Sequence, residues 1–494
     1  MLTELGRRIN MQYQLIPNNL NPGAKGCDIS IVCDTKLLQV RWGLKENYPQ
    51  ELNSITIGDK LRITKNGTYC VELVGATQKI KTEFTIFHLN TPKGFAGGNG
   101  SSEAPYLITC CADFNLIRLN LNAHYQLISN LDFGKEMGDL CWLPIGTYSQ
   151  KEPKHSEYSV LDSQNIDHIV DFGFIGCLDG NGHKISGLKC ENSKSKYIGL
   201  FGSCGPNSYI HDLLIENCFF SGCQALAIGS IAGYAYGAKI EHCVVRDGTI
   251  FTQLIGGGII GECNGSTRIK CCQFVGKLSG KGIDGSESYL GGIIGCIHEK
   301  KTNMSQIENC CVKTQITNCA YGGGILSGNG AIISKCFFSG IIHAKRYAAG
   351  VVAPGRFCIV EKCVCGPAEI CYASNRPPSY IDSAWVTLFD KITHDFKSVF
   401  QNNVWLNHAG RIVCDDYELV PQQKFVNYAA HDCKLVSLEG EHAFIDGSLR
   451  DGITILTHEL CDVSFYAKIS WDFDVHWELG KDHFPQIKFL SCEN

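Results

Sequence analysis

The stretch that decides the fold is SESYLGGIIGCIHEKKTNMSQIENCCV, residues 286–312. A glycine pair precedes a short Ile-rich segment, and a turn then leads to an IENC segment that ends on cysteine. Similar units recur between residues 197 and 370, about 26 residues apart, with an insertion around HEKKTNM. The cysteines that match between units are Cys218, Cys243, Cys271, Cys310, Cys336 and Cys363.

A repeat of this length, made of short strands separated by glycine, predicts an all-β parallel solenoid. Each coil lays its strands on those of the coil below, roughly 4.8 Å away. Glycine suits the corners, because they require backbone angles and close approaches that a side chain blocks. Residues at equivalent positions of successive coils therefore form ladders through the molecule.

The recurring cysteine is interpreted as core packing, because a free thiol is a small, largely apolar group. Stacked cysteines could instead be oxidised, but in-register side chains point the same way, which strains a disulfide. A metal site is not expected, since there is no Cys-x-x-Cys. The adjacent pairs Cys271–Cys272 and Cys310–Cys311 send their side chains to opposite faces of a strand.

Composition limits the class of protein. The 494 residues can form several domains, and 44 Lys plus Arg against 49 Asp plus Glu, without a basic run, argue against a nucleic-acid partner. We find no apolar segment of signal-peptide or membrane-span length, so no membrane partner is expected. The 28 cysteines favour a reducing compartment or assembly inside the cell.

The chain divides into four predicted regions. They are a β-sandwich over residues 1–93, a Gly/Ser-rich linker over 94–104, the solenoid over 105–370 and an aromatic-rich capping region over 371–494. A cap is expected because the open edge of a solenoid promotes aggregation. Alternatively, the tryptophans in WDFDVHWELG, residues 471–480, present rings to a sugar.

Three stretches carry a family resemblance. ITKNGTYCVELVGATQKIKTEFTI, residues 63–86, resembles bacterial immunoglobulin-like domains, and the repeated units resemble GLUG repeats. LDGNGHKISGL, residues 178–188, is similar to the first coil of pectate-lyase-like β-helix domains. The resemblance to β-helix proteins covers residues 94–490. It implies a right-handed parallel β-helix, a fold common in bacterial surface, secreted and phage proteins, and it implies no single activity.

Four acidic residues are candidates for catalysis or for Ca²⁺ binding: Asp247, Glu262, Asp284 and Glu287. They can approach one another across coils, and a glycoside hydrolase requires two carboxyl groups. Grouped carboxylates are also the ligands that Ca²⁺ prefers. Solvated turn acids are the commoner explanation, and no other cofactor is expected.

Four tyrosines near the coil corners are candidates for binding: Tyr234, Tyr236, Tyr289 and Tyr347. Outward rings can stack on sugars or on a protein partner, although exposed turn residues are common. We favour a non-catalytic structural, adhesive or assembly module that binds glycans or proteins, with side-by-side oligomers as an option. The alternatives are a polysaccharide lyase or glycoside hydrolase, and a virus or phage particle component or delivered effector.

Overall fold

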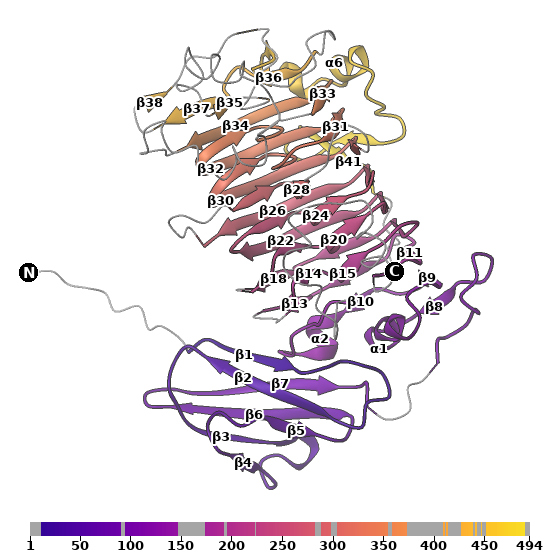
Figure 1. Ribbon diagram of the computed structural model, residues 1–494, viewed down its shortest axis with the longest axis vertical. Coiled ribbons are helices and arrows are strands. Elements are labelled where there is room, and N and C mark those ends of the chain that lie inside the picture. Colours follow the sequence, from indigo (N-terminus) through magenta and orange to yellow (C-terminus); the bar gives the residue numbers. More distant parts are fainter. Residues whose placement is uncertain are drawn as a thin grey trace, which may run out of the picture.

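The structure is a computed structural model of the chain. The residues that it describes are 11–89, 94–146, 173–191, 195–222, 224–281, 288–297, 304–353, 358–372, 409–410, 412, 426–437, 440–441, 446 and 451–489. A small body of antiparallel strands at one end is joined to a long stack of parallel strands (Figure 1). No helix in these ranges has both the length and the apolar character needed to cross a bilayer.

The N-terminal body consists of two antiparallel sheets. One sheet contains β1 (Tyr13–Pro17), β2 (Cys27–Cys33) and β5 (Leu61–Ile63); the other contains β3 (Leu37–Leu44), β4 (Asn53–Ile55), β6 (Gly67–Gly75) and β7 (Lys79–Ile86). Buried Leu15, Ile29, Val71 and Phe84 belong to its core. Bridges from Leu15 to Leu140 and from Phe84 to Gly138 join this body to the base of the solenoid.

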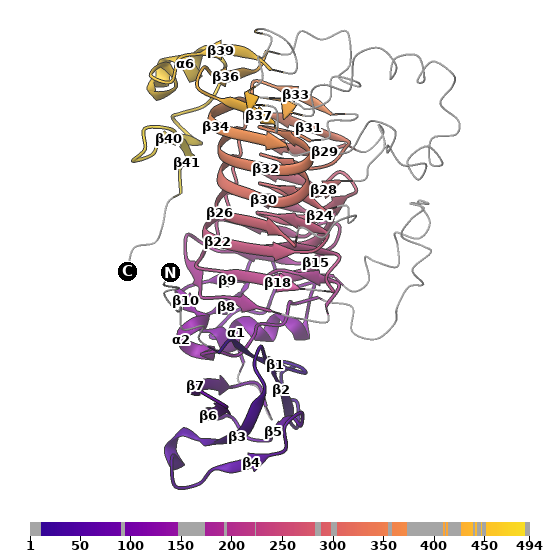
Figure 2. The same ribbon diagram turned by 90° about the vertical axis from the view of Figure 1, so that its left-hand side faces the viewer.

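Few helices are present in the described residues. The α-helices are α1 (Cys111–Asn115), α2 (Phe133–Met137) and α6 (Val463–Lys468), and the short 3-10 helices are η1 (Lys45–Asn47), η2 (Leu116–Leu119) and η5 (Glu459–Cys461). Helices α1 and α2 lie between the N-terminal body and the first coils (Figure 2). The Asn115 amide donates to the Leu20 carbonyl across this junction, at 2.6 Å.

Three sheets form the solenoid. The side sheet contains β8 (Tyr106–Ile108), β9 (His124–Leu127), β11 (Cys177–Asp179), β16 (Tyr209–His211), β21 (Lys239–Glu241), β25 (Arg268–Lys270), β29 (Ser305–Glu308), β31 (Ala331–Ser334) and β33 (Ile359–Glu361). The corner sheet contains β15 (Phe201–Cys204), β20 (Ala232–Tyr236), β24 (Ile260–Asn264) and β28 (Ile294–Ile297).

The third sheet, the long sheet, follows the whole stack. Its strands are β10 (Leu131–Asp132), β12 (Lys184–Ser186), β13 (Lys189–Cys190), β14 (Tyr197–Ile198), β17 (Leu214–Glu216), β18 (Phe219–Gly222), β19 (Ala227–Gly229), β22 (Val244–Thr252), β23 (Ile255–Gly257), β26 (Gln273–Gly280), β27 (Tyr289–Gly291), β30 (Cys311–Gly323), β32 (Phe337–Ala349), β34 (Val364–Tyr372), β35 (Ala409–Gly410), β36 (Tyr428–Ala430), β37 (Lys434–Ser437), β38 (Gly440–Glu441) and β39 (Ile453–Ile455).

The coils stack in register, and the prediction of a β-solenoid is confirmed, with about six turns. One inward ladder of the long sheet consists of Ile185, Ile215, Val245, Phe274, Val312 and Phe338, each paired with the next and each fully buried. Such apolar, often β-branched side chains suit strands that are stacked on both sides. The core of the solenoid is therefore continuous from coil to coil.

The cysteine ladder differs from the predicted one at two positions. The observed members are Cys243, Cys272, Cys310, Cys336 and Cys363, and each directly follows a residue with φ of 51–55°. Cys271 itself has φ 52° and occupies that left-handed turn, so the prediction for this coil was wrong by one residue.

Cys218 was also placed wrongly in that ladder. Residues 215–218 and 307–310 both read IENC, but they form different corners. Glu216 pairs with Arg246, so Asn217 (φ 52°) corresponds to Asp247 (φ 53°), the second left-handed turn of its coil. The same IENC sequence therefore occurs at two different corners, because asparagine is well tolerated at either left-handed position.

The stacked cysteines are reduced and packed. All cysteines that the structure describes are free thiols. Cys243 and Cys336 lie 3.3 Å from the carbonyl oxygens of Glu241 and Ser334, respectively. Burial holds the pKa of the Cys243 and Cys310 thiols well above the usual range, which keeps them uncharged.

A glycine ladder forms one corner of the coils. Gly229, Gly257, Gly291 and Gly323 pair in sequence along the long sheet. A Cβ built on Gly291 would lie 1.8 Å from the Ile294 carbonyl oxygen, because the chain folds back on itself within three residues. Space, rather than a positive φ, requires glycine at this position.

The described part of the C-terminal region does two things. Strands β36 and β39 add parallel rungs to the long sheet beyond β34. Residues 471–488 then run back along the outside of the solenoid, where β40 (Trp477–Leu479) and β41 (Pro485–Ile487) form a hairpin (Figure 2). We call residues 471–488 the clasp; they cover a lateral face of the coils, whereas end-capping by residues 371–494 stays a prediction.

Candidate functional site

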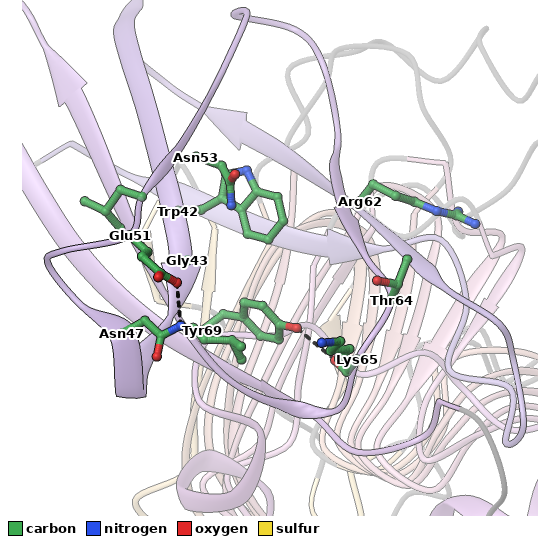
Figure 3. Close-up of a pocket in the computed structure, with 11 residues that line it drawn as sticks. Trp42, Gly43, Asn47, Glu51, Asn53, Arg62, Thr64, Lys65 and Tyr69 are labelled. Atoms are coloured by element: carbon green, nitrogen blue, oxygen red, sulfur yellow. Dashed lines mark hydrogen bonds between the residues drawn. The ribbon is translucent and has the colours of Figure 1, made fainter.

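A pocket of about 430 Å³ opens at one end of the N-terminal body, between its two sheets (Figure 3). Its lining comes from β3, β4, β5, β6 and the two connections β3–β4 and β5–β6. The lining residues are Trp42, Gly43, Leu44, Asn47, Glu51, Leu52, Asn53, Arg62, Thr64, Lys65 and Tyr69. This site was not among the sequence-based candidates.

Two aromatic rings form the apolar part of this pocket. The Trp42 and Tyr69 ring centroids are 5.9 Å apart, and Tyr69 stacks on buried Phe84 at 5.5 Å. The Tyr69 hydroxyl donates to the Lys65 carbonyl at 2.9 Å, which fixes the ring. The buried Trp42 indole N–H has no hydrogen-bond partner in the described part of the chain. Unpartnered buried donors are uncommon in folded proteins, so this one marks the pocket as unusual.

Polar side chains surround the two rings (Figure 3). The Asn47 amide donates to the Glu51 carboxylate at 2.6 Å, and Arg62 forms an ion pair with Asp28 at 2.8 Å. A Cβ on Gly43 would lie 2.3 Å from the Glu51 carbonyl oxygen, so only glycine allows the β3–β4 connection to approach this closely. Rings edged by amides, carboxylates and cations match a ligand with an apolar face and many hydroxyls.

The predicted binding tyrosines lie on the outer surface where the long sheet meets the corner sheet. One outer ladder consists of Tyr197, Ala227, Ile255, Tyr289, Tyr321 and Tyr347, in register from coil to coil. Tyr234 lies opposite it and contacts Tyr197 at 5.2 Å between ring centroids. We call this ladder, with Tyr234 and Tyr236, the tyrosine strip; the sequence interpretation missed its members Tyr197 and Tyr321.

The tyrosine strip is packed rather than open. Tyr289 and Tyr321 stack at 4.5 Å, and Tyr321 and Tyr347 at 5.5 Å, with nearly parallel rings. Tyr234 and Tyr289 are only 3% and 8% exposed, whereas Tyr236 and Tyr347 are half-buried. Tyr234 and Tyr289 are therefore largely covered although they lie on the outer surface, because neighbouring rungs stack their side chains together; a binding role for the four tyrosines stays a prediction.

The acidic candidates separate. Glu262 in β24 is paired in register between Tyr234 and Cys296, so it belongs beside the tyrosine strip. Asp247 is exposed at a left-handed turn in β22 of the long sheet. Asp284 and Glu287 lie outside the described residues. The structure thus brings Glu262 together with tyrosines and places Asp247 in a different sheet.

Glu262 makes stability depend on pH. Burial raises the pKa of its carboxyl to about 7. Between the ordinary glutamate pKa of about 4.3 and 7 the folded protein binds more protons than the unfolded chain, so stability falls as the pH rises. We expect Glu262→Gln to exceed wild-type stability by about 1–2 kcal/mol at pH 8 and to match it near pH 4.

Denaturant unfolding at a series of pH values measures this difference. Asp247→Asn is the matched control, because that carboxylate is exposed at its turn. Glu262 is half-buried, and parallel pH profiles for wild type and Glu262→Gln would contradict a raised pKa of its carboxyl.

Comparisons with known proteins give partial matches. No family model matches the chain, so the GLUG and immunoglobulin-like resemblances stay predictions. Halomucin of Haloquadratum walsbyi is 31% identical over 170 residues, which is 33% of this chain and 2% of halomucin. A "Putative Gly-rich membrane protein" of Evansella cellulosilytica is 30% identical over 160 residues, 31% of this chain and 16% of that protein. The chain therefore spans a small fraction of either relative.

Two solved structures match the chain with TM-scores below 0.5. A "putative immunoglobulin A1 protease from Bacteroides ovatus" has a TM-score of 0.46 at 16% identity and covers 80% of this chain and 96% of its own. A structure named "IgA1 Protease" has a TM-score of 0.39 at 11% identity, over 98% of this chain and 33% of its own.

Proposed function

We propose that this protein is a non-catalytic binding module that takes a glycan in the Trp42–Tyr69 pocket. The observation that carries the proposal is the pair of rings inside an open pocket edged by Asn47, Glu51 and Asn53. Aromatic faces stack on the apolar faces of sugar rings, and side-chain amides and carboxylates bond hydroxyls. The solenoid serves as a stiff support that holds the pocket at one end.

The setting supports the same role. The inward ladders of the solenoid are fully buried from coil to coil, which favours a scaffold over a flexible linker. Two partial relatives carry the names "Halomucin" and "Putative Gly-rich membrane protein", and the second name suits a membrane-associated setting for the matched segment. Protein partners and side-by-side oligomers stay within this proposal as further uses of the flat outer sheets.

A glycoside hydrolase is the second candidate, and one observation favours it. The raised pKa of Glu262, about 7, suits a general acid at neutral pH. Such an enzyme requires a second carboxyl group roughly 5–10 Å away. Glu262 is flanked in its own ladder by Tyr234 and Cys296, so a partner carboxylate has to come from another part of the chain.

The test mixes the full chain with a panel of neutral and acidic oligosaccharides. Calorimetry measures binding, and a count of new chain ends, with and without Ca²⁺, measures cleavage. We expect binding without new ends. Loss of the Trp42 ring in Trp42→Ala should weaken binding about 10- to 100-fold, since a buried aromatic face contributes about 1.5–3 kcal/mol.

Two further variants keep the test clear. Leu38→Ala removes a side chain that is 58% exposed on the same strand and should bind normally. Asn53→Ala trims the exposed rim without touching the core and should weaken binding several-fold. Undiminished binding in both Trp42→Ala and Asn53→Ala would overturn the pocket assignment. New chain ends that disappear in Glu262→Gln would establish the hydrolase instead.

A further inference from the structure

A cluster of two histidines and a cysteine lies where the clasp meets the solenoid. His242 and Cys271 directly follow β21 and β25 and occupy the same left-handed turn in successive coils, with φ of 51° and 52°. Their backbones are fixed by the rungs, since the His242 amide donates to the Lys270 carbonyl at 3.0 Å. The two side chains are thus held one coil apart by the repeat itself.

The third member, His476, comes from the clasp. Its ring centroid is 5.7 Å from that of His242, and the potential ligand atoms of His242, Cys271 and His476 all lie within 4.8 Å of one another. The neighbouring Trp477 is fully buried and its indole N–H donates to Asn309 Oδ1 at 3.4 Å. His476 is therefore positioned by its buried neighbour Trp477 and by its own backbone N–H, which donates to the Asp472 carbonyl at 3.0 Å.

The chemistry of the three groups suits a metal ion. His476 Nδ1 is buried and has no hydrogen-bond partner among the described residues. A ring nitrogen without such a partner can offer its lone pair to an ion when the imidazole is neutral. Cys271 is fully buried, and a metal ion would convert its thiol to the thiolate that it needs as a ligand.

We propose that His242, Cys271 and His476 bind a single Zn²⁺ ion that fastens the clasp to the solenoid. Two imidazole nitrogens and one thiolate are typical zinc ligands, and three protein ligands leave a fourth position for water. This site is independent of the glycan pocket.

The experiment uses full-length protein freed of metal with a chelator and then titrated with Co²⁺ as a spectroscopic probe and with Zn²⁺ by calorimetry. We expect one ion per chain and a thiolate-to-cobalt absorption band. Cys271→Ser should abolish that band and weaken Zn²⁺ binding at least 100-fold. Cys311→Ser is the matched control, because that thiol is also buried under the clasp but contacts the Pro485 carbonyl at 3.2 Å instead.

The fastening role has its own readout. Zn²⁺ should slow proteolytic release of the clasp at least 10-fold in wild type and in Cys311→Ser. It should have no such effect in His242→Ala, and because the His242 ring is only half-buried, its removal should not open the core. No thiolate band in wild type, or a band that persists in Cys271→Ser, would overturn the site. Equal proteolysis with and without Zn²⁺ would overturn the fastening role.

Discussion

Replacing Gly291 by alanine is expected to destabilise the solenoid by about 3 kcal/mol or more and to lower its melting temperature and soluble yield. The added Cβ would lie 1.8 Å from the Ile294 carbonyl oxygen and 2.8 Å from the Ser327 amide nitrogen. Both contacts are with backbone, so no side-chain rotation relieves them. The coil must open at this corner, and the rungs on either side, at Gly257 and Gly323, would lose register.

Gly94→Ala is the matched control for this variant. A Cβ at Gly94 meets no heavy atom within 4 Å, so the same change should leave the melting temperature unchanged. Thermal unfolding followed by circular dichroism compares the two proteins directly. Equal melting temperatures for Gly291→Ala and wild type would mean that this corner has room for a Cβ atom.

Replacing Trp477 by alanine is expected to release the clasp while the coils stay folded. Trp477 is fully buried, stacks on Trp471 at 4.4 Å and donates to Asn309. Removing a buried tryptophan lowers stability by about 3–5 kcal/mol. A short surface hairpin is held by less free energy than that, so the clasp should detach. Limited proteolysis with mass spectrometry should therefore show early cuts within residues 471–488.

Val475→Ala controls for the position of the change. Val475 is 58% exposed and lies in the turn just before β40, so trimming its side chain should leave the cleavage pattern as in wild type. If Trp477→Ala also kept that pattern, the Lys313–Asp482 ion pair and the Gln273–Ile487 hydrogen bond would have to hold the clasp alone. That outcome would contradict the central role given to the tryptophan stack.

The solenoid could be predicted from the sequence because its repeat is visible in short local patterns, namely glycines at the corners, short Ile-rich strands and recurring cysteines. It was harder to predict the register, that is, which residues of successive coils lie opposite one another. IENC at residues 215–218 and 307–310 occupies two different corners, and Cys271 lies in a turn next to the ladder cysteine Cys272. Only the strand pairing, with Glu216 opposite Arg246, separates these cases.

The sites were predicted less well than the fold. The face of the solenoid on which the tyrosines and Glu262 lie could be inferred from their places in the repeat. The burial of Tyr234 and Tyr289 could not, because it depends on neighbouring side chains from other coils. The Trp42–Tyr69 pocket arises between two sheets and has no sequence motif; its only local signal was the polar segment KENYPQELN, residues 45–53, after a tryptophan-containing strand. The histidine–cysteine cluster joins residues far apart in the chain, beyond any spacing rule.

The clasp also has a consequence for the order in which the chain is made. Each coil bonds mainly to the coil before it, so coils can form while synthesis proceeds. The Ile487 amide, however, bonds to Gln273 across 214 residues. Until residue 487 exists, the outer face that carries Cys311 and Phe337 lacks its cover. Chains truncated before the clasp would therefore expose an apolar strip and be recognised by chaperones or aggregate, whereas finished chains would not.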